Sequence, residues 1–325
     1  MKTKEHIILP IVAVVLLTIG SCTPCSCPEP NPPMISQYNL DKSIVEINTT
    51  NVSTGFETVF KKTIHDSTDR AHFSQVFVDA ARFYEDASGY FFIETLNDAW
   101  VVAHINHDLI GTSRINIEDE NGKFFIQEMV ETVSYSGHGY VEYYRLNPST
   151  DIKERKMSFV TSISSANWFI GTGFYGGPSN TYYEYEEVQE LILKEVTRTM
   201  ALGVAGIFDN FYTEETEKID FCRDFIDHIR YFDDGSGYFF ICDFIGINIA
   251  HGANAEFQGE NLIDLQDTHG AYIIRDMIDI VEQDGYGYYE YYWNNPATGK
   301  EDTKVTYVIH IPNTDYFVGA GYYLN

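Results

Sequence analysis

Two short runs of aromatic and β-branched residues stand close together in the first half of the chain. The first spans 89–93 with the letters GYFFI, and the second spans 100–104 with the letters WVVAH. Asn97 and Asp98 lie between them and are typical of a turn, so the pattern predicts a β-hairpin. Apolar residues in the preceding segment, 73–84, share one helical stripe, which predicts a helix that covers the sheet.

Further elements follow the hairpin. The polar segment 111–122 is rich in Asp and Asn and is expected to be a loop, and an apolar-periodic helix through Phe125 ends at Gly137. Three strands are then predicted, at 140–146, 156–162 and 168–174. The last two form an antiparallel pair, and Pro148 is confined to a connection, where its missing N–H does no harm. Such a unit is an antiparallel sheet of about 100 residues with helices on one face.

The whole pattern occurs twice. Gly89 and Gly237 begin the two copies of GYFFI, which sets a spacing of 148 residues. Many other residues obey this spacing, among them the pairs Arg82/Arg230, Ser88/Ser236, Gly111/Gly259, Asp119/Asp267, Gly137/Gly285, Tyr143/Tyr291, Asn147/Asn295, Lys156/Lys304 and Gly173/Gly321. A one-residue slip places His104 opposite His251. The chain is therefore an internal duplication.

Helical spacing also marks the segments that lead into each copy. Segment 182–211 predicts a long helix before the second copy, and segment 43–61 is expected to be its shorter counterpart. The predicted fold class is α+β, with two tandem modules joined by a long helix, each a central antiparallel sheet with flanking helices. The expected domains are a signal segment at 1–21, a tether at 22–36, and modules at 37–178 and 179–325.

The first 22 residues are typical of an export signal. Lys2 and Lys4 precede an apolar segment, 7–19, that is too short for a typical membrane span. The following letters IGSC, 19–22, resemble the bacterial lipoprotein box, in which the cysteine is acylated and becomes the new N-terminus. An ordinary secretory signal is the alternative. We expect an exported lipoprotein anchored through Cys22 on the extracytoplasmic side, in the periplasm or at the cell surface, with a Pro-rich tether.

Length and composition favour folded domains outside the cytoplasm. The chain has 325 residues, of which 44% are hydrophobic, and this is enough for two cores. Its 48 acidic and 21 basic residues give a formal net charge of -27. Because this field repels phosphate groups, nucleic acid is not an expected partner. A carboxylate ligand would need Arg or Lys placed next to it.

The cysteines leave two alternatives open. Disulfides persist in exported chains, so Cys222 and Cys242 are a possible disulfide pair between a helix and the following strand. The alternative is two buried free thiols. Cys25 and Cys27 fall in the tether without His or acidic residues at ligand spacing, so no metal site is expected there.

Four features in the same order resemble the extracytoplasmic Cache domain family, specifically its PAS-like single-Cache type 2. They are the GYFFI strand, a loop that begins at a histidine, a G-x-G-[FY]-V-E-Y-x-W-x-N-P hairpin and a final K-x-[ST]-Y-V…G-[TA]-G-[VY]-Y segment. They occupy 89–93, 104–122, 137–148 and 156–175, and again 237–241, 251–270, 285–296 and 304–323. Ile105 and Gly252 follow the histidines where the family has proline, so the loop over the pocket departs from the pattern.

The resemblance implies a fold of two tandem PAS-like Cache modules and a sensor-type function. Modules of this type bind small molecules, often carboxylates, between a curved sheet and its covering loops. The chain has no second apolar segment after the second copy, so we expect it to act through a separate receptor or transporter. The alternative is a structural or interaction lipoprotein whose modules have lost their pockets.

Basic residues at matching positions are the first candidates for binding a small organic acid. They are Arg82, Lys156, Arg230 and Lys304. A buried carboxylate needs charge-assisted donors in fixed geometry. Alternatively, Arg82 pairs with Asp86 one helical turn on, and Arg230 pairs likewise with Asp234. Strand alternation leaves open whether the two lysines point inward.

Aromatic residues and histidines complete the candidate site. Tyr90 and Phe92 share one strand face and Phe91 lies on the other, so one set faces a pocket or core. The candidates are Tyr90, Phe92, His104, Tyr143, Tyr238, Phe240, His251 and Tyr291. Tyrosine offers a small acid an apolar wall and a donor. Ordinary core packing is the alternative for the aromatic residues, and a satisfied histidine at a loop base is the alternative for the histidines.

The sequence offers little chemistry for an enzyme. It contains no Gly-x-Ser-x-Gly, no His-Glu-x-x-His and no phosphate-binding glycine loop. Asp119 and Asp267 stand in Asp-x-x-Gly settings that are typical of turns and helix caps. We therefore expect a binding protein without catalytic residues, metal or cofactor.

Overall fold

The structure, a computed structural model, describes residues 34–324, which form one compact unit. The expected signal segment at 1–21, the lipidation site at Cys22 and most of the tether at 22–36 lie outside the described residues.

The first module spans residues 37–175. Its helices are α1 (Gln37–Lys62), α2 (Ser67–Ala80) and α3 (Phe125–Ser136). Its strands are β2 (Phe91–Thr95), β3 (Val101–His104), β4 (His138–Asn147), β5 (Ile152–Ile163) and β6 (Trp168–Tyr175), and a single turn, η1 (His107–Leu109), follows β3. The strands form an antiparallel sheet in the order β3-β2-β6-β5-β4.

The second module spans residues 185–323 and repeats each of these elements. Its helices are α4 (Tyr185–Asn210), α5 (Glu215–Ile226) and α6 (Ile273–Asp284). Its strands are β8 (Phe239–Asp243), β9 (Asn248–His251), β10 (Tyr286–Asn295), β11 (Lys300–His310) and β12 (Tyr316–Tyr323), with η2 (Ala255–Phe257) after β9. The sheet order β10-β11-β12-β8-β9 matches the first module. The prediction of two tandem α+β modules is confirmed.

A sheet of two short strands links the segments that lead into the two modules. β1 (Ile35–Ser36) pairs antiparallel with β7 (Tyr182–Tyr183), and each strand lies just before the long helix of its module. The side chain of Ser36 then caps α1, because its Oγ accepts a hydrogen bond from the backbone N–H of Asn39 at 3.3 Å.

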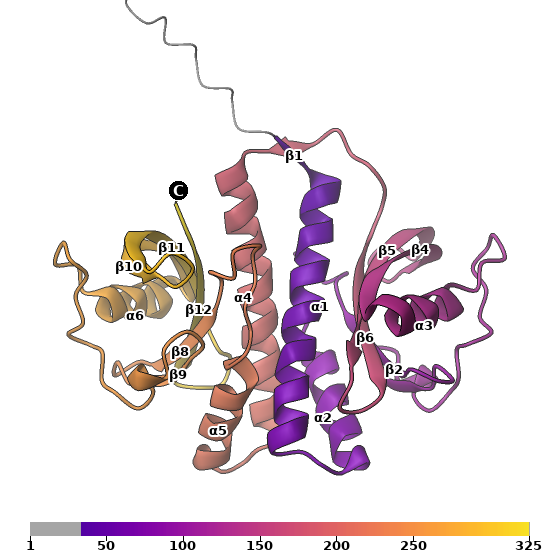
Figure 1. Cartoon of the computed structure of the whole chain (residues 1–325), viewed down its shortest axis with the longest axis horizontal. Helices are drawn as coiled ribbons and strands as arrows, with labels where there is room; N and C mark the ends of the chain where they lie inside the picture. Colours follow the sequence, from indigo (N-terminus) through magenta and orange to yellow (C-terminus); the bar gives the residue numbers. More distant parts are fainter. Residues whose placement is uncertain (1–33, 325) are drawn as a thin grey trace, which may run out of the picture. The chain divides into compact units, whose positions relative to one another are not determined.

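Helices cover both faces of each sheet, whereas the sequence predicted helices on one face only. One face of each sheet packs on the core that α1, α2, α4 and α5 share. The other face is covered by α3 in the first module and by α6 in the second (Figure 1). Phe91 belongs to the core on the side of α1 and α2, whereas its neighbours Tyr90 and Phe92 belong to the core on the side of α3. A strand that is buried on both faces has no polar face, so its sequence alternation cannot show how many faces are covered.

Two predicted helices have different bounds in the structure. α1 has 26 residues, as α4 does, so it is not the shorter counterpart. α2 ends at Ala80, and Tyr84 beyond it has a left-handed φ of 62°. Phe232 repeats this φ of 62° in the second module. Because a left-handed residue cannot continue a right-handed helix, Tyr84 leaves the predicted stripe.

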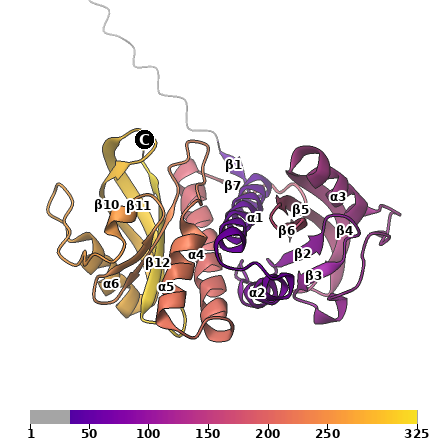
Figure 2. The same ribbon diagram turned by 60° about the horizontal axis from the view of Figure 1, so that its bottom comes forward.

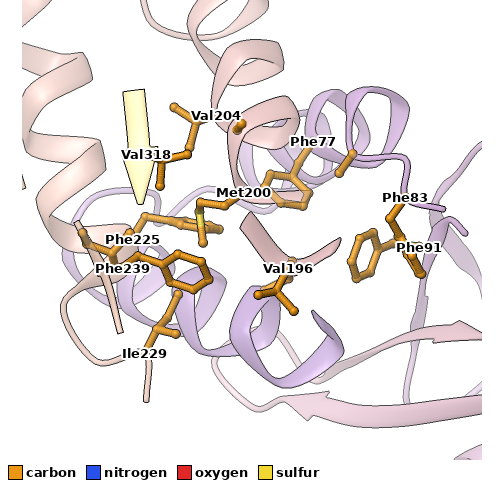
Figure 3. Packing of buried hydrophobic residues seen from close by; sticks show 14 of the residues in the cluster. Phe77, Phe83, Phe91, Val196, Met200, Val204, Phe225, Ile229, Phe239 and Val318 are labelled. Carbon is orange, nitrogen blue, oxygen red and sulfur yellow. The ribbon is translucent and has the colours of Figure 1, made fainter. Parts of the chain in front are cut away.

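The two modules pack on each other through a reciprocal pair of contacts between glycine and phenylalanine. α1 and α4 lie side by side between the sheets, as Figures 1 and 2 show. A Cβ built on Gly55 in α1 would lie 2.7 Å from the ring of Phe225 in α5, and one built on Gly203 in α4 would lie 2.1 Å from the ring of Phe77 in α2. Gly55 and Gly203 are equivalent positions of the duplication, as are Phe77 and Phe225. The copies thus meet as two subunits of a symmetric dimer would, around a shared aromatic core (Figure 3).

Candidate functional site

Five of the six predicted residues of the first module meet on the sheet face that α3 covers. Tyr90 lies just before β2, Phe92 on β2, His104 at the end of β3, Tyr143 on β4 and Lys156 on β5. All five side chains are buried. The hairpin between β2 and β3 places His104 opposite Phe92, and the pairing of β4 with β5 places Tyr143 opposite Lys156. The duplication therefore identified residues that come together in space.

Lys156 is fully buried and points inward. Its Nζ lies 3.9 Å from the ring centroid of Tyr90 and 4.7 Å from that of Tyr175, and it donates to the Tyr175 hydroxyl at 3.4 Å. Burial lowers the pKa of Lys156. Burial also raises the pKa of the Tyr90 phenol, but the adjacent Lys156 ammonium, together with Tyr175 and the charge of Arg114, outweighs this and brings the pKa of Tyr90 down to about 8.

The two loop-base histidines share one hydrogen-bonding arrangement. The Nδ1 atom of His104 accepts from the backbone N–H of Asn106 at 2.8 Å, and Nδ1 of His251 accepts from that of Asn254 at 2.9 Å. Burial, together with neighbouring cations, lowers the pKa of each histidine to about 3. Both rings are therefore neutral near pH 7, and each carries its proton on Nε2, where it can be donated.

The sequence did not reveal a buried ion pair beside these residues. Arg114, in the loop after η1, donates from Nη1 to Oε1 of Glu94 on β2 at 2.7 Å, and the two side chains are 5% and 0% exposed. Burial raises the pKa of Glu94 to about 7, against the opposing effect of Arg114. Within residues 34–324, the Nε of Arg114 and Oε2 of Glu94 have no hydrogen-bond partner. At the equivalent positions the second module has Leu262 and Cys242, so comparing the copies for shared residues could not identify this pair.

Arg145 on β4 is a further cation that the sequence did not reveal. Its guanidinium lies 6.0 Å from the ring centroid of Phe125, and that of Arg114 lies 5.9 Å from the same ring. Phe125 in turn stacks on Tyr143 with centroids 4.2 Å apart. In the described part of the chain neither Arg145 nor Lys156 forms an ion pair. Arg114, Arg145 and Lys156 thus lie close together in the first module. Glu94 pairs with Arg114, and Glu154 stands opposite Arg145 on β5, which leaves an excess of positive charge that can accept an anion.

The second module keeps the frame of the site and changes its charges. Lys304 is buried with its Nζ 3.8 Å from the ring centroid of Tyr238 and 5.2 Å from that of Tyr323. Burial lowers the pKa of Lys304 well below its ordinary range. Four of the six predicted residues of this module line a small cavity of about 20 Å³ between the sheet and α6; they are Tyr238, Phe240, His251 and Tyr291. Trp293, which the sequence also did not single out, stands where the first module has Arg145.

Both halves of the chain match descriptions of one family. Residues 38–181 match the Single Cache domain 2, and residues 178–325 match the Cache domain. The chain belongs to the extracytoplasmic Cache domain family. Cache domains are sensory modules that bind small molecules, and in this chain two of them stand in tandem.

Similar proteins include parts of bacterial signalling receptors. The sensor histidine kinase MctS of Rhizobium johnstonii is 35% identical over 89 residues, which cover 27% of this chain and 19% of that protein. A methyl-accepting chemotaxis protein from Vibrio parahaemolyticus is 25% identical with a TM-score of 0.38, over 43% of this chain and 91% of that one. A Cache chemosensory domain described for carboxylic acid recognition is 22% identical with a TM-score of 0.37, over 44% of this chain and 100% of that one.

Arg82 and Arg230 support loops of the Cache modules and do not form the ion pairs considered above. Arg82 donates from Nε to the carbonyl of Gly89 at 3.2 Å and from Nη2 to that of Ala87. Arg230 donates to the carbonyl of Ile229 at 2.6 Å and to that of Gly252. Asp86 and Asp234 instead accept from backbone N–H groups two residues on, at 3.0 and 2.9 Å. α2 ends at Ala80 and α5 ends at Ile226, so neither arginine lies on a helix that would align it with the aspartate four residues on.

The possible disulfide is not formed. Cys222 and Cys242 are both free, buried thiols, so the second alternative describes the structure. Cys222 belongs to the core on the helix side of the second sheet, and Cys242 belongs to the core on the α6 side. Because the sheet separates the two sulfur atoms, no pairing is possible without rearranging the fold. Burial raises the pKa of Cys242 to about 12, which keeps this thiol protonated.

Two kinds of feature are absent from the described residues. Among residues 34–324, no group of three His, Cys, Asp or Glu side chains could hold a metal ion. No helix in that range is long and apolar enough to cross a membrane.

Proposed function

We propose that the chain is a lipid-anchored sensor-type protein whose first Cache module binds a small carboxylate. The observation that carries this proposal is the positive charge at Arg114, Arg145 and Lys156, which exceeds the negative charge of the neighbouring carboxylates Glu94 and Glu154. An anion in this place would complete the charge balance of a buried site. The positive charge of the site would also offset the repulsion that a chain with a formal net charge of -27 exerts on an anion.

The donors suit a carboxylate in geometry as well as in charge. Arg114 uses one Nη1 for Glu94 and leaves Nε without a partner in the described structure, so it retains a hydrogen-bond donor. A planar guanidinium binds a carboxylate through two parallel bonds, which orients the ligand. Tyr90 and the Nε2–H of His104 supply further donors, and the stacked rings of Phe125 and Tyr143 supply an apolar wall. This composition fits an acid with a short apolar body.

The anchor and the partner of the chain belong to the same proposal. Residues 19–22 carry the lipoprotein-box letters, and acylation of Cys22 would hold the modules at the extracytoplasmic membrane surface. The ligand-dependent signal would then pass to a separate receptor or transporter, as the similarity to sensor parts of signalling receptors suggests. Palmitate labelling of the full chain and of its Cys22→Ser variant tests the anchor directly.

Ligand-dependent stabilisation tests the carboxylate proposal. Residues 33–325, which include the compact unit, are melted with acetate, pyruvate, succinate, amino acids, amines and purines. A ligand at about 100 times its dissociation constant should add about 2.7 kcal/mol to the free energy of unfolding. We expect a shift with carboxylates that is lost in the Arg145→Trp variant, which carries the residue of the second module. No shift with any compound, in a well-folded protein, would favour the alternative of a non-binding interaction lipoprotein.

A further inference from the structure

The second Cache module has lost the positive charges that distinguish the first. Seven equivalent positions carry four basic and three acidic residues in the first module: Arg114, Arg145, Lys153, Lys156, Glu94, Asp119 and Glu154. In the second module the same positions carry one basic and three acidic residues: Leu262, Trp293, Glu301, Lys304, Cys242, Asp267 and Asp302. Strand registers support the equivalence, because Arg145 pairs with Glu154 and Trp293 pairs with Asp302.

A cavity with aromatic walls opens in the second module at this place. It has a volume of about 450 Å³, and its walls include Tyr238, His251, Phe257 and Trp293. The rings form a continuous series: Tyr238 lies 5.1 Å from His251, His251 lies 5.3 Å from Phe257, and Phe257 lies 6.0 Å from Trp293, measured between centroids. Four aromatic rings thus contribute to the wall of one cavity that can hold a small molecule.

The charge at this cavity is negative. Asp267 and Glu301 contribute to its lining, and the lining contains no Lys or Arg. Asp267 is ionised, because hydrogen bonds from the backbone N–H groups of Ala271, Tyr292 and His269 outweigh the effect of burial and lower its pKa. Glu301 is exposed and accepts from the Thr268 hydroxyl at 3.0 Å.

The two cations nearest to the cavity are not part of its lining. Lys304 lies beneath the rings of Tyr238 and Tyr323, where burial lowers the pKa of its ammonium. Arg230 lines a different groove and donates to backbone carbonyls, among them those of Ile229 and Gly252. The surface that a ligand would contact is therefore aromatic and acidic.

A buried acceptor lies at the inner end of the same pocket. Asn248 is 1% exposed, and it lines the inner cavity of about 20 Å³ that shares Tyr238, His251 and Trp293 with the larger cavity. Its Nδ2 donates to the sulfur of Cys242 at 3.4 Å, whereas its Oδ1 has no partner among the described residues. A buried carbonyl oxygen without a partner favours a ligand, or a water beneath the ligand, that donates a hydrogen bond to it.

We propose that the second module binds a small organic cation, an amine or methylated ammonium, within the rings of Tyr238, Phe257 and Trp293. Aromatic faces attract a cation through their quadrupoles, tryptophan most strongly, and the carboxylates at the rim strengthen the attraction. A carboxylate ligand would meet two like charges in this cavity and no lining cation. This inference rests on the proposed function as a small-molecule sensor and extends it: the two modules bind ligands of opposite charge.

Calorimetric titration of residues 33–325 with choline tests this inference. The control ligand is the uncharged carbon isostere of choline, in which a tert-butyl group replaces the trimethylammonium group. We expect choline to bind and the isostere to bind at least tenfold more weakly, because the π-faces and carboxylates act on the charge. Equal binding of both compounds, or no binding of choline, would overturn the inference.

Variants taken from the other module identify the site. Glu301→Lys introduces into the second module the residue that the first module has at this position, Lys153. It should weaken choline binding severalfold, and it should not affect folding because Glu301 is exposed. Glu301→Gln should have a smaller effect, and Lys153→Glu, the reverse change in the first module, should have none.

Acetate, pyruvate and succinate are titrated in parallel. Binding of a carboxylate but not of choline would reject this inference alone, whereas binding of neither class would reject the proposed function as well.

Discussion

The ring of Phe77 packs against the ring of Phe225, with centroids 5.7 Å apart, although the two residues occupy equivalent positions of the two modules. Each ring also contacts a glycine of the opposite module, Gly203 for Phe77 and Gly55 for Phe225. The duplicated helices therefore share one core.

Gly203→Ala should destabilise both modules together. Its Cβ would lie 2.1 Å from the Phe77 ring, so the helices must separate or the ring must move, at a cost of roughly 1–3 kcal/mol. Urea denaturation should show a single transition at a lower midpoint. Adding Phe77→Leu should recover part of the loss, because the smaller side chain leaves room for the methyl group. Separate transitions for the two modules would contradict a shared core.

Removing Arg114 should be more harmful than removing the ion pair. Arg114→Leu leaves the buried Glu94 carboxylate without its partner and should cost roughly 3–5 kcal/mol. Glu94→Cys with Arg114→Leu reproduces the pair Cys242 and Leu262 and should restore most of the stability, because no buried charge remains. Unfolding free energies from urea denaturation measure both effects. If the double variant were as unstable as the single one, the structural role assigned to the pair would be wrong.

Lys156 should give Tyr90 an early ionisation. With the pKa of Tyr90 lowered to about 8, one of the 24 tyrosines should form phenolate well before the others in a spectroscopic pH titration. Lys156→Met should abolish this step, because the ammonium that stabilises the phenolate is gone. Lys304→Met is the matched control and should leave the titration unchanged, since burial raises the pKa of Tyr238 well above its ordinary value. An early step that persisted in Lys156→Met would refute this assignment.

Acid should destabilise the protein partly through its buried histidines. The folded pKa of His104 is about 3, below the ordinary value of 6.5, so its contribution to stability is present above pH 6.5 and is lost as the pH falls toward 3. At about pH 5 the loss should be about 2 kcal/mol.

A non-titrating substitution isolates this contribution. His104→Asn keeps an acceptor for the Asn106 N–H and should remove the loss, as His251→Asn should in the second module. Unfolding free energies at about pH 7.5 and about pH 5 give the comparison. An unchanged pH dependence in both variants would show that these histidines are not held neutral.

The duplication made much of the site predictable from the sequence. Lys156 and Lys304, Tyr90 and Tyr238, and the two histidines were found because each recurs in both copies. The structure then placed the members of each set side by side on one face of their sheet.

What differs between the copies could not be found in the same way. A search for repeated residues excludes Arg114, Arg145 and Trp293, because each occurs in one copy only. Their position beside Phe125 or Phe257 in the structure identifies them as candidate site residues. The contact of Gly203 with Phe77 also depends on how the modules pack, which strand and helix periodicity do not report.

One titration tests the central claim most directly. Acetate, pyruvate and succinate are titrated by calorimetry into residues 33–325, and into the variants Arg145→Trp and Trp293→Arg. We predict that at least one carboxylate binds the unsubstituted protein at one site per chain, that Arg145→Trp abolishes this binding, and that Trp293→Arg retains it. Failure of every carboxylate to bind the folded protein, or binding that persists in Arg145→Trp, would contradict a carboxylate site in the first module.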